Sequence, residues 1–341
     1  MVSEVKMINA DDIIKKIYRT VKSHQSGEAG SYQRWLWQDE SLTRDLGVNE
    51  YGCADAANIL YTIGEFPHDS AERAKWTDTL QSLQNKETGL FTEKTHHPIH
   101  TTAHCTAALE LFDAKPLYPM TALEYCSTKE GLFNLLENLP WLTNPWDASH
   151  QGAGIYAALV LSGNTEASWC DAYFDWIWDN SDPETGFIGK RWISRSKAPL
   201  FYYLAGTFHY LFNLEYAHMP LRYPDKVIDS CLYLYENEYK PGGFLDATKI
   251  GFSMVDWVYC TNRASRQSAH RFAECKKALS DVAVGYTVFL SELDEKSHDD
   301  FNDLHSLFGC TCALAELQQS VPGMIKSTRP LRLVLDRRPF I

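Results

Sequence analysis

The sequence has no excess of basic residues. Its 341 residues include 44 Asp and Glu against 32 Lys and Arg, which gives a formal net charge of −12. Nucleic-acid-binding proteins present a basic stripe to phosphates, and anionic lipid surfaces likewise attract Lys and Arg. The composition therefore predicts no nucleic-acid partner. There is also no run of about 18 apolar residues, so no membrane span is predicted.

Several short catalytic motifs are also missing. The chain has no Gly-rich phosphate loop, and Gly152-Ala153-Gly154 lies within a helical pattern rather than after a strand. It has no Gly-x-Ser-x-Gly elbow and no His-Glu-x-x-His pair. Nucleotide and hydride chemistry are therefore not predicted.

The cysteines do not indicate a disulfide framework. There are nine, an odd number, and several lie inside helical patterns, as Cys105 and Cys231 do. Such residues are typical of reduced thiols in a cytosolic protein. The segment Met1–Lys6 lacks the basic and apolar regions of a secretory signal. A cytoplasmic location is the expectation.

A pattern of glycine-centred turns and helices rich in small residues recurs six times, about every 50 residues. The predicted turns are Glu87–Phe91, Lys129–Phe133, Glu184–Phe187 and Pro241–Phe244. The predicted helices are Tyr51–Tyr61, His100–Leu111, His150–Leu161, Tyr202–Phe212, Asp256–Gln267 and His305–Leu317. A helical hairpin of this length cannot bury its apolar face alone, so neighbouring hairpins must pack side by side.

This repeat predicts an all-α protein with a single (α/α)6 toroid over residues 35–318. Outer helices are expected between the inner ones, because apolar residues there recur at spacings of three and four, as in Trp76, Leu80 and Leu83. An N-terminal helix with a flexible lead-in is expected over residues 1–34. Residues 319–341 are expected to form a C-terminal tail, with Leu331–Leu335 lying across the ring.

Polar residues recur at one position of the inner helices. Superposing the six helices aligns Tyr51, His100, His150, Tyr202, Asp256 and His305. One turn deeper lie Asp55, His104, Gly154, Gly206, Cys260 and Gly309. Residues at i and i+4 share a helix face, so both layers should face the central cavity. A lone inward His is usually a satisfied core residue. We interpret the first aligned layer, which runs from Tyr51 to His305, and Asp55 of the deeper layer as catalytic. This interpretation rests on the whole set rather than on any one residue.

A second group of residues is predicted to bind substrate around this layer. Its members are His104, Trp146, Asp147, Gln151, Trp257 and Arg263. The tryptophans would provide aromatic platforms, and Arg263 would neutralise a substrate carboxylate. His100 and His104 have a spacing able to chelate zinc, with His150 as a third ligand. No metal ligand set is assigned, however, and no cofactor is expected.

The turn-and-helix pattern resembles a known group of folds. Gln84-x-x-x-x-Gly89-x-Phe91, followed by His100-Thr-Thr-Ala-His-Cys-Thr-Ala-Ala-Leu109, is similar to repeats of the α/α-toroid superfamily. One branch contains six-hairpin glycosidases, polysaccharide lyases and sugar epimerases. The other contains terpenoid cyclases and protein prenyltransferases, but this chain lacks an Asp-x-Asp-Asp motif. The resemblance implies the toroid and assigns no catalytic residue.

Three functions fit these observations. The leading prediction is an enzyme acting on a sugar or uronic-acid-containing glycan by His/Tyr acid–base chemistry, as a lyase, epimerase or glycoside hydrolase. His100, His150 or His305 would be the base, and Tyr51 or Tyr202 would be the acid. Hydrolysis would instead need two carboxylates, with Asp55, Asp147 and Asp256 available.

The first alternative is a terpenoid-type cyclase, isomerase or dehydratase with a mainly apolar cavity, in which Asp55 would protonate the substrate. The second is a non-catalytic ligand-binding or scaffold toroid. The expected partner is a small molecule or an oligosaccharide. Aromatic residues on the outer helices could also form a face for a second copy of the chain.

Overall fold

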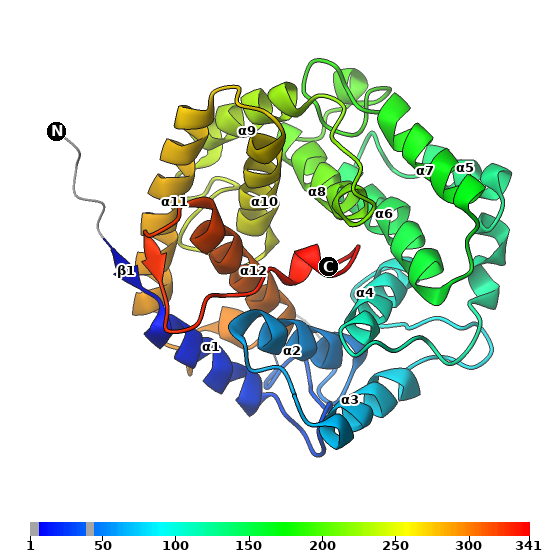
Figure 1. Ribbon diagram of the computed structural model, residues 1–341, viewed down its shortest axis with the longest axis vertical. Helices are drawn as coiled ribbons and strands as arrows, with labels where there is room; N and C mark the ends of the chain where they lie inside the picture. Colours follow the sequence, from blue (N-terminus) through cyan, green and yellow to red (C-terminus); the bar gives the residue numbers. More distant parts are fainter. Residues whose placement is uncertain (1–6, 39–43) are drawn as a thin grey trace.

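The structure, a computed structural model, describes residues 7–38 and 44–341, and in these it is a ring of helical hairpins (Figure 1). The inner helices are α2 (Glu50–Ile63), α4 (Pro98–Glu110), α6 (Pro145–Ser162), α8 (Leu200–Tyr216), α10 (Phe252–Gln267) and α12 (Leu304–Ser320). The outer helices are α1 (Asp11–Ser23), α3 (Ser70–Ser82), α5 (Lys129–Glu137), α7 (Ala167–Asp179), α9 (Pro224–Glu238) and α11 (Phe272–Glu292). The predicted all-α toroid is confirmed.

Short elements complete the described chain. Four 3₁₀ turns are η1 (Thr121–Cys126), η2 (Ile193–Arg195), η3 (Asp299–Phe301) and η4 (Val334–Asp336). Two short parallel strands, β1 (Ile8–Asn9) and β2 (Ile325–Lys326), pair near the two ends of the described chain. None of the described helices is long and apolar enough to cross a membrane.

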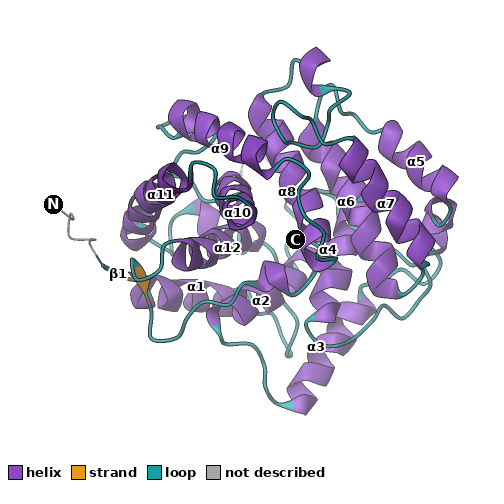
Figure 2. Ribbon diagram, turned by 45° about the horizontal axis from the view of Figure 1, so that its top comes forward, coloured by secondary structure: helices purple, strands orange, loops and turns teal. Residues whose placement is uncertain are grey.

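The inner helices form a closed inner ring. Each packs against the next in chain order, and α12 packs against α2 (Figure 2). Small residues allow this close approach, since a Cβ at Gly154 would lie 3.2 Å from the Ile99 side chain. These helices are buried almost all round, as expected for a helix that is apolar on every face. The six predicted inner helices are therefore confirmed.

The ring begins earlier than residue 35. Helix α1 buries Ile13, Ile17 and Val21 and packs against α2, α11 and α12. The predicted boundary placed this helix in a separate lead-in, whereas in the structure it packs against the ring. The apolar face of α1 covers the junction where the last hairpin meets the first, so it is needed to close the ring.

The predicted turn at Lys129–Phe133 is also wrong, because these residues form the start of helix α5. Thr128 caps the helix by accepting a hydrogen bond from the Gly131 amide, and Leu132 lies buried on its inner face. A Cβ at Gly131 would lie only 1.6 Å from the Tyr125 carbonyl oxygen. The glycine thus marks a close backbone contact within a helix rather than a turn.

The other glycine turns are confirmed, and two of them make a matched test. Gly186 and Gly242 have φ of 76° and 77°, but only at Gly186 would a Cβ meet backbone, 2.5 Å from the Val227 nitrogen. Gly186→Ala should lower the free energy of unfolding by about 2–4 kcal/mol, through left-handed strain and overpacking. Gly242→Ala should cost only about 1–2 kcal/mol. Urea denaturation measures both, and equal losses would contradict the close contact at Gly186.

The C-terminal tail turns into the centre of the ring (Figure 1). The Arg332 amide donates a hydrogen bond to the Thr62 carbonyl oxygen near the end of α2. Further along, Asn213 donates to the Pro339 carbonyl oxygen, and Phe340 is fully buried. The tail therefore packs inside the ring, against the C-terminal parts of α2 and α8.

Candidate active site

A small cavity lies on the ring axis, where the inner helices begin. Trp146, Phe252 and His305 line it from the first or second residue of their helices. Its volume is about 110 Å³, and its lining consists of His96, His100, Trp146, His150, His209, Phe252, His305 and Ile341. At about 30 Å³ per water molecule, it holds roughly three or four waters. Five imidazoles surround this space.

A buried carboxylate organises one side of the cavity. Asp55 on α2 accepts hydrogen bonds from His104 Nε2 at 2.9 Å and from His305 Nδ1 at 3.1 Å. Burial alone would raise the pKa of Asp55, but the two neighbouring rings and their hydrogen bonds hold it well below its ordinary value. The ionised carboxylate therefore fixes the orientation of His305.

His305 lines the cavity, and within the described chain only one of its two ring nitrogens is hydrogen-bonded. Among the described residues, Nε2 of His305 has no hydrogen-bond partner, whereas Nδ1 is bonded to Asp55. Burial lowers the pKa of His305 to about 4, although the Asp55 charge opposes this shift. The imidazole is therefore neutral near pH 7 and able to accept a proton, as a general base must.

A tyrosine supports the next histidine of the ring. The Tyr51 hydroxyl and His100 Nδ1 share a hydrogen bond of 2.6 Å. Burial raises the pKa of Tyr51 well above its ordinary value of 10.0, so the phenol stays protonated. Tyr51 is fully buried and is not among the residues that line the cavity. The structure therefore places it behind His100.

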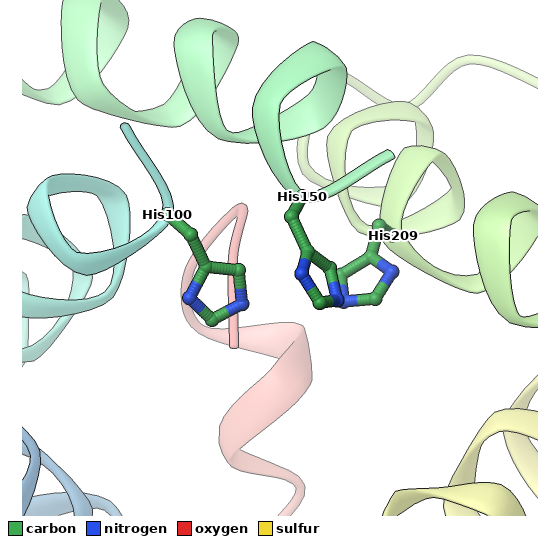
Figure 3. Close-up of side chains that lie close together, drawn as sticks. All are labelled: His100, His150 and His209. Atoms are coloured by element: carbon green, nitrogen blue, oxygen red, sulfur yellow. The ribbon is translucent and has the colours of Figure 1, made fainter. Parts of the chain in front are cut away.

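Three of the cavity histidines come from consecutive inner helices. His100 (α4), His150 (α6) and His209 (α8) turn their rings toward a common space (Figure 3). The ring centroids are 4.5 Å apart for His100 and His150 and 4.8 Å apart for His150 and His209. Burial and the neighbouring imidazoles lower the pKa of His100 and His150 well below 6.5, and burial lowers that of His209 to about 3. All three rings are therefore neutral near pH 7.

Superposing the six predicted inner helices by sequence placed Tyr202 at the cavity and did not identify His209. The cause is a shift of α8 along its axis, because a Cβ at Gly206 would lie 3.1 Å from the Pro145 carbonyl oxygen. Gly206 is thus level with the start of α6, and His209 comes level with His150. The one available signal was His209 itself, a polar residue within the apolar run Leu204–Leu214.

Three residues predicted at the cavity lie elsewhere. Tyr202 is half-buried beside Trp146 but does not line the cavity. Asp256 is fully buried without a hydrogen-bond partner among the described residues, and Phe252, one turn earlier on α10, lines the cavity instead. Trp257 donates from Nε1 to the Cys231 carbonyl oxygen on outer helix α9. The predicted places of Tyr202, Asp256 and Trp257 are therefore wrong.

Arg263 also lies away from the cavity. It is 1% exposed and forms ion pairs with Glu215, Glu316 and Asp336, the last of which belongs to the tail. These carboxylates already neutralise the guanidinium, so it is not available to a substrate. The predicted place of Arg263 at the cavity is therefore wrong, and the residue instead joins α8, α10, α12 and the tail.

The remaining predicted binding residues differ in how close they lie to the cavity. Trp146 lines the cavity, whereas His104 is fully buried behind it and bonded to Asp55. Asp147 is exposed, with a carboxylate oxygen 3.8 Å from His150 Nδ1. Gln151 is half-buried and forms no hydrogen bond with its side chain among the described residues.

The isolated Asp256 carboxyl provides a test based on pH. Burial raises its pKa well above 3.8, so folding keeps it protonated while the unfolded chain ionises. Above pH 3.8 the wild type should therefore lose about 1.4 kcal/mol of stability per pH unit, up to the raised pKa. Asp256→Asn should stabilise the protein at pH 7, and the gain should shrink as the pH falls toward 4. Denaturant unfolding at several pH values measures it, with the exposed Asp12→Asn as control. A gain that does not change with pH would contradict the protonated state.

Comparison with known proteins agrees with the toroid. No protein-family profile matches the sequence, and a search of curated proteins finds no match. Among solved structures, the chain is similar to an inactive variant of the α-1,6-mannanase GH76A of Salegentibacter sp. HEL1_6 in complex with α-1,6-mannotetrose. The TM-score is 0.51, and the chains are 14% identical over 90% of this chain and 98% of the mannanase. At this identity the likeness establishes the shared (α/α)6 fold alone.

Proposed function

We propose that the protein is an enzyme that acts on a sugar or glycan at the cavity by histidine acid–base chemistry. The observation that carries the proposal is the arrangement of His305. An ionised, fully buried Asp55 holds one ring nitrogen, and the other has no hydrogen-bond partner among the described residues, on a ring that lines the cavity. A base held by a third group in this way is a general feature of acid–base and nucleophilic sites.

The surroundings of His305 suit a sugar. Trp146 and Phe252 lie beside the imidazoles at the cavity and provide apolar faces for a pyranose ring. The N-terminal ends of the inner helices also meet here, and their dipoles favour an anionic group such as a uronate. The cavity of about 110 Å³ is smaller than the roughly 300 Å³ of a typical ligand site, so a glycan would place only its reacting end here.

The chemistry proposed differs from that of a hydrolase with adjacent aspartates. The inactive mannanase carries alanine in place of two consecutive aspartates. In this chain the consecutive pairs are Asp11–Asp12 on α1 and Asp299–Asp300 in η3, and neither lines the cavity. The imidazoles and Asp55 therefore favour proton abstraction, as in elimination or epimerisation, over hydrolysis by two carboxylates.

The terpenoid alternative has less support. It requires a mainly apolar cavity and a protonated Asp55, but five imidazoles line the space and the pKa of Asp55 is lowered. A non-catalytic toroid would also bind a ligand here, but it would convert nothing. Product formation therefore distinguishes a glycan-acting enzyme from a non-catalytic ligand-binding toroid.

A screen of neutral and uronic-acid-containing polysaccharides tests the proposal with three readouts. Elimination gives new reducing ends together with ultraviolet absorbance from unsaturated uronates, whereas hydrolysis gives reducing ends alone. Epimerisation gives neither, but it incorporates deuterium from heavy water at the inverted carbon. At least one of these activities is expected from the wild type, with a loss of about 100- to 10,000-fold in His305→Gln.

The matched control is His68→Gln, which changes an exposed histidine in the loop before α3. It should leave turnover at the level of the wild type. Binding of an oligosaccharide without any of the three products would support the scaffold instead. Equal turnover by His305→Gln and the wild type would contradict the role given to His305.

A further inference from the structure

His100, His150 and His209 have the geometry of a ligand set. Each offers one ring nitrogen, and these atoms lie within 4.8 Å of one another. In a tetrahedral zinc site, Zn–N distances of about 2.0–2.1 Å place the ligand nitrogens about 3.3 Å apart. The three rings face a common space in Figure 3, and their nitrogens would have to approach by up to about 1.5 Å to reach that separation.

We propose that His100, His150 and His209 bind one divalent transition-metal ion. Imidazole nitrogen suits zinc, copper, nickel and iron, whereas magnesium and calcium take oxygen ligands. All three rings belong to the lining of the same cavity, so one ion there can reach a nitrogen of each. Three protein ligands that leave a fourth position open are typical of catalytic rather than structural zinc sites.

The second ring nitrogens of His100 and His209 support this assignment. His209 Nδ1 lies 2.9 Å from the Ala205 carbonyl oxygen, so this nitrogen carries the proton and leaves the Nε2 lone pair free. His100 Nδ1 can donate to the Tyr51 oxygen at 2.6 Å. Among the described residues, Nε2 of His100 and of His209 has no hydrogen-bond partner. Metal-ligating histidines usually donate their other N–H to an oxygen in this way, which fixes the tautomer and the ring orientation.

The cavity supplies the open position. The three rings line the space of about 110 Å³, which has room for a metal-bound water or one ligand atom of a substrate. Asp55, His104 and His305 also have ligand atoms within 4.8 Å of one another. In that second group, however, Asp55 already accepts hydrogen bonds from both rings, at 2.9 and 3.1 Å. The three-histidine group is therefore the one with unused lone pairs.

The metal proposal goes beyond the proposed function, and its test needs no substrate. The untagged full chain is stripped with a chelator, dialysed and titrated with Co²⁺, followed by visible absorption. Zn²⁺ then competes for the same site, and elemental analysis gives the stoichiometry. One ion per chain is expected. His209→Gln should weaken binding at least 100-fold, and Tyr51→Phe by about 10- to 100-fold. His68→Gln should bind like the wild type.

Two results would overturn the proposal. One is a wild type that takes up no stoichiometric Co²⁺ or Zn²⁺, and the other is unchanged binding in a folded His209→Gln. If that variant does not fold, anomalous diffraction from wild-type crystals soaked in Zn²⁺ decides the question. A peak between His100, His150 and His209 supports the proposal, and a peak elsewhere or no peak refutes it. A negative result in these metal-binding experiments does not bear on the glycan activity, which the polysaccharide screen tests separately.

Discussion

Asp55→Asn is expected to lower kcat for the glycan substrate by about 100- to 10,000-fold. Asp55 accepts hydrogen bonds from His104 and His305, and its negative charge supports a protonated His305 during turnover. An asparagine keeps one acceptor oxygen, but it carries no charge and would place an NH₂ group where Oδ2 now lies 3.2 Å from His305 Nδ1. His305 would then lose its fixed tautomer and its electrostatic support, while the substrate contacts at Trp146 would remain. The fall should therefore appear in kcat more than in KM, as steady-state kinetics can measure.

Two measurements distinguish a catalytic effect of Asp55→Asn from a general loss of folded structure. One is its free energy of unfolding, and the other is the activity of a variant at a second buried carboxylate. Asp55→Asn should also lower the free energy of unfolding by about 1–3 kcal/mol, since two buried N–H groups exchange a charged acceptor for a neutral one. Asp246→Asn changes another buried carboxylate, which accepts hydrogen bonds only within its own turn and does not line the cavity. This control should keep kcat. Equal kcat in the wild type and a folded Asp55→Asn would refute the role of the Asp55–His305 pair.

Arg263→Met is expected to lower the free energy of unfolding by about 3–5 kcal/mol. The guanidinium is 1% exposed, and its loss would leave Glu316, which is also 1% exposed, as a buried charge without its cation. Asp336 of the tail would lose the same partner, so the tail should become more accessible to protease. Urea denaturation and limited proteolysis measure the two effects.

The controls for Arg263 use a surface pair and a second substitution. Arg271→Met breaks ion pairs with Glu274 and Asp229 at a position where the arginine side chain is 31% exposed, so it should cost about 1 kcal/mol or less. Adding Glu316→Gln to Arg263→Met should recover part of the loss, because the uncompensated charge is removed. A stable Arg263→Met with weakened substrate binding would instead support the role in binding that the sequence alone indicated.

The fold was largely predictable because the inner helices repeat. Their small and apolar residues recur in all six copies, and a closed ring satisfies each copy in the same way. The error in the predicted turns arose because glycine serves two different structural purposes. Glycine takes a positive φ in a loop turn at Gly186 but allows a close backbone contact within a helix at Gly131. Sequence alone does not show the Tyr125 carbonyl that approaches Gly131, and α5 was missed for that reason.

The site was predictable only in part, because its residues depend on how far each helix slides along its axis. His100, His150 and His305 lie at matching depths and line the cavity as expected. Helix α8 is displaced relative to α6, so His209 takes the place predicted for Tyr202. On α10, Phe252 takes the place predicted for Asp256. Such shifts follow from packing contacts between helices, which a repeat alignment does not contain.

The most direct test of the central claim is a crystal structure of Asp55→Asn soaked with neutral and uronic-acid-containing oligosaccharides. The variant should bind substrate without converting it. The account predicts a sugar unit at the mouth of the cavity, with its reacting carbon beside His305 and its ring against Trp146 or Phe252. An empty cavity, or sugar bound only at the outer surface of the ring, would contradict a glycan-acting site at the centre of this toroid.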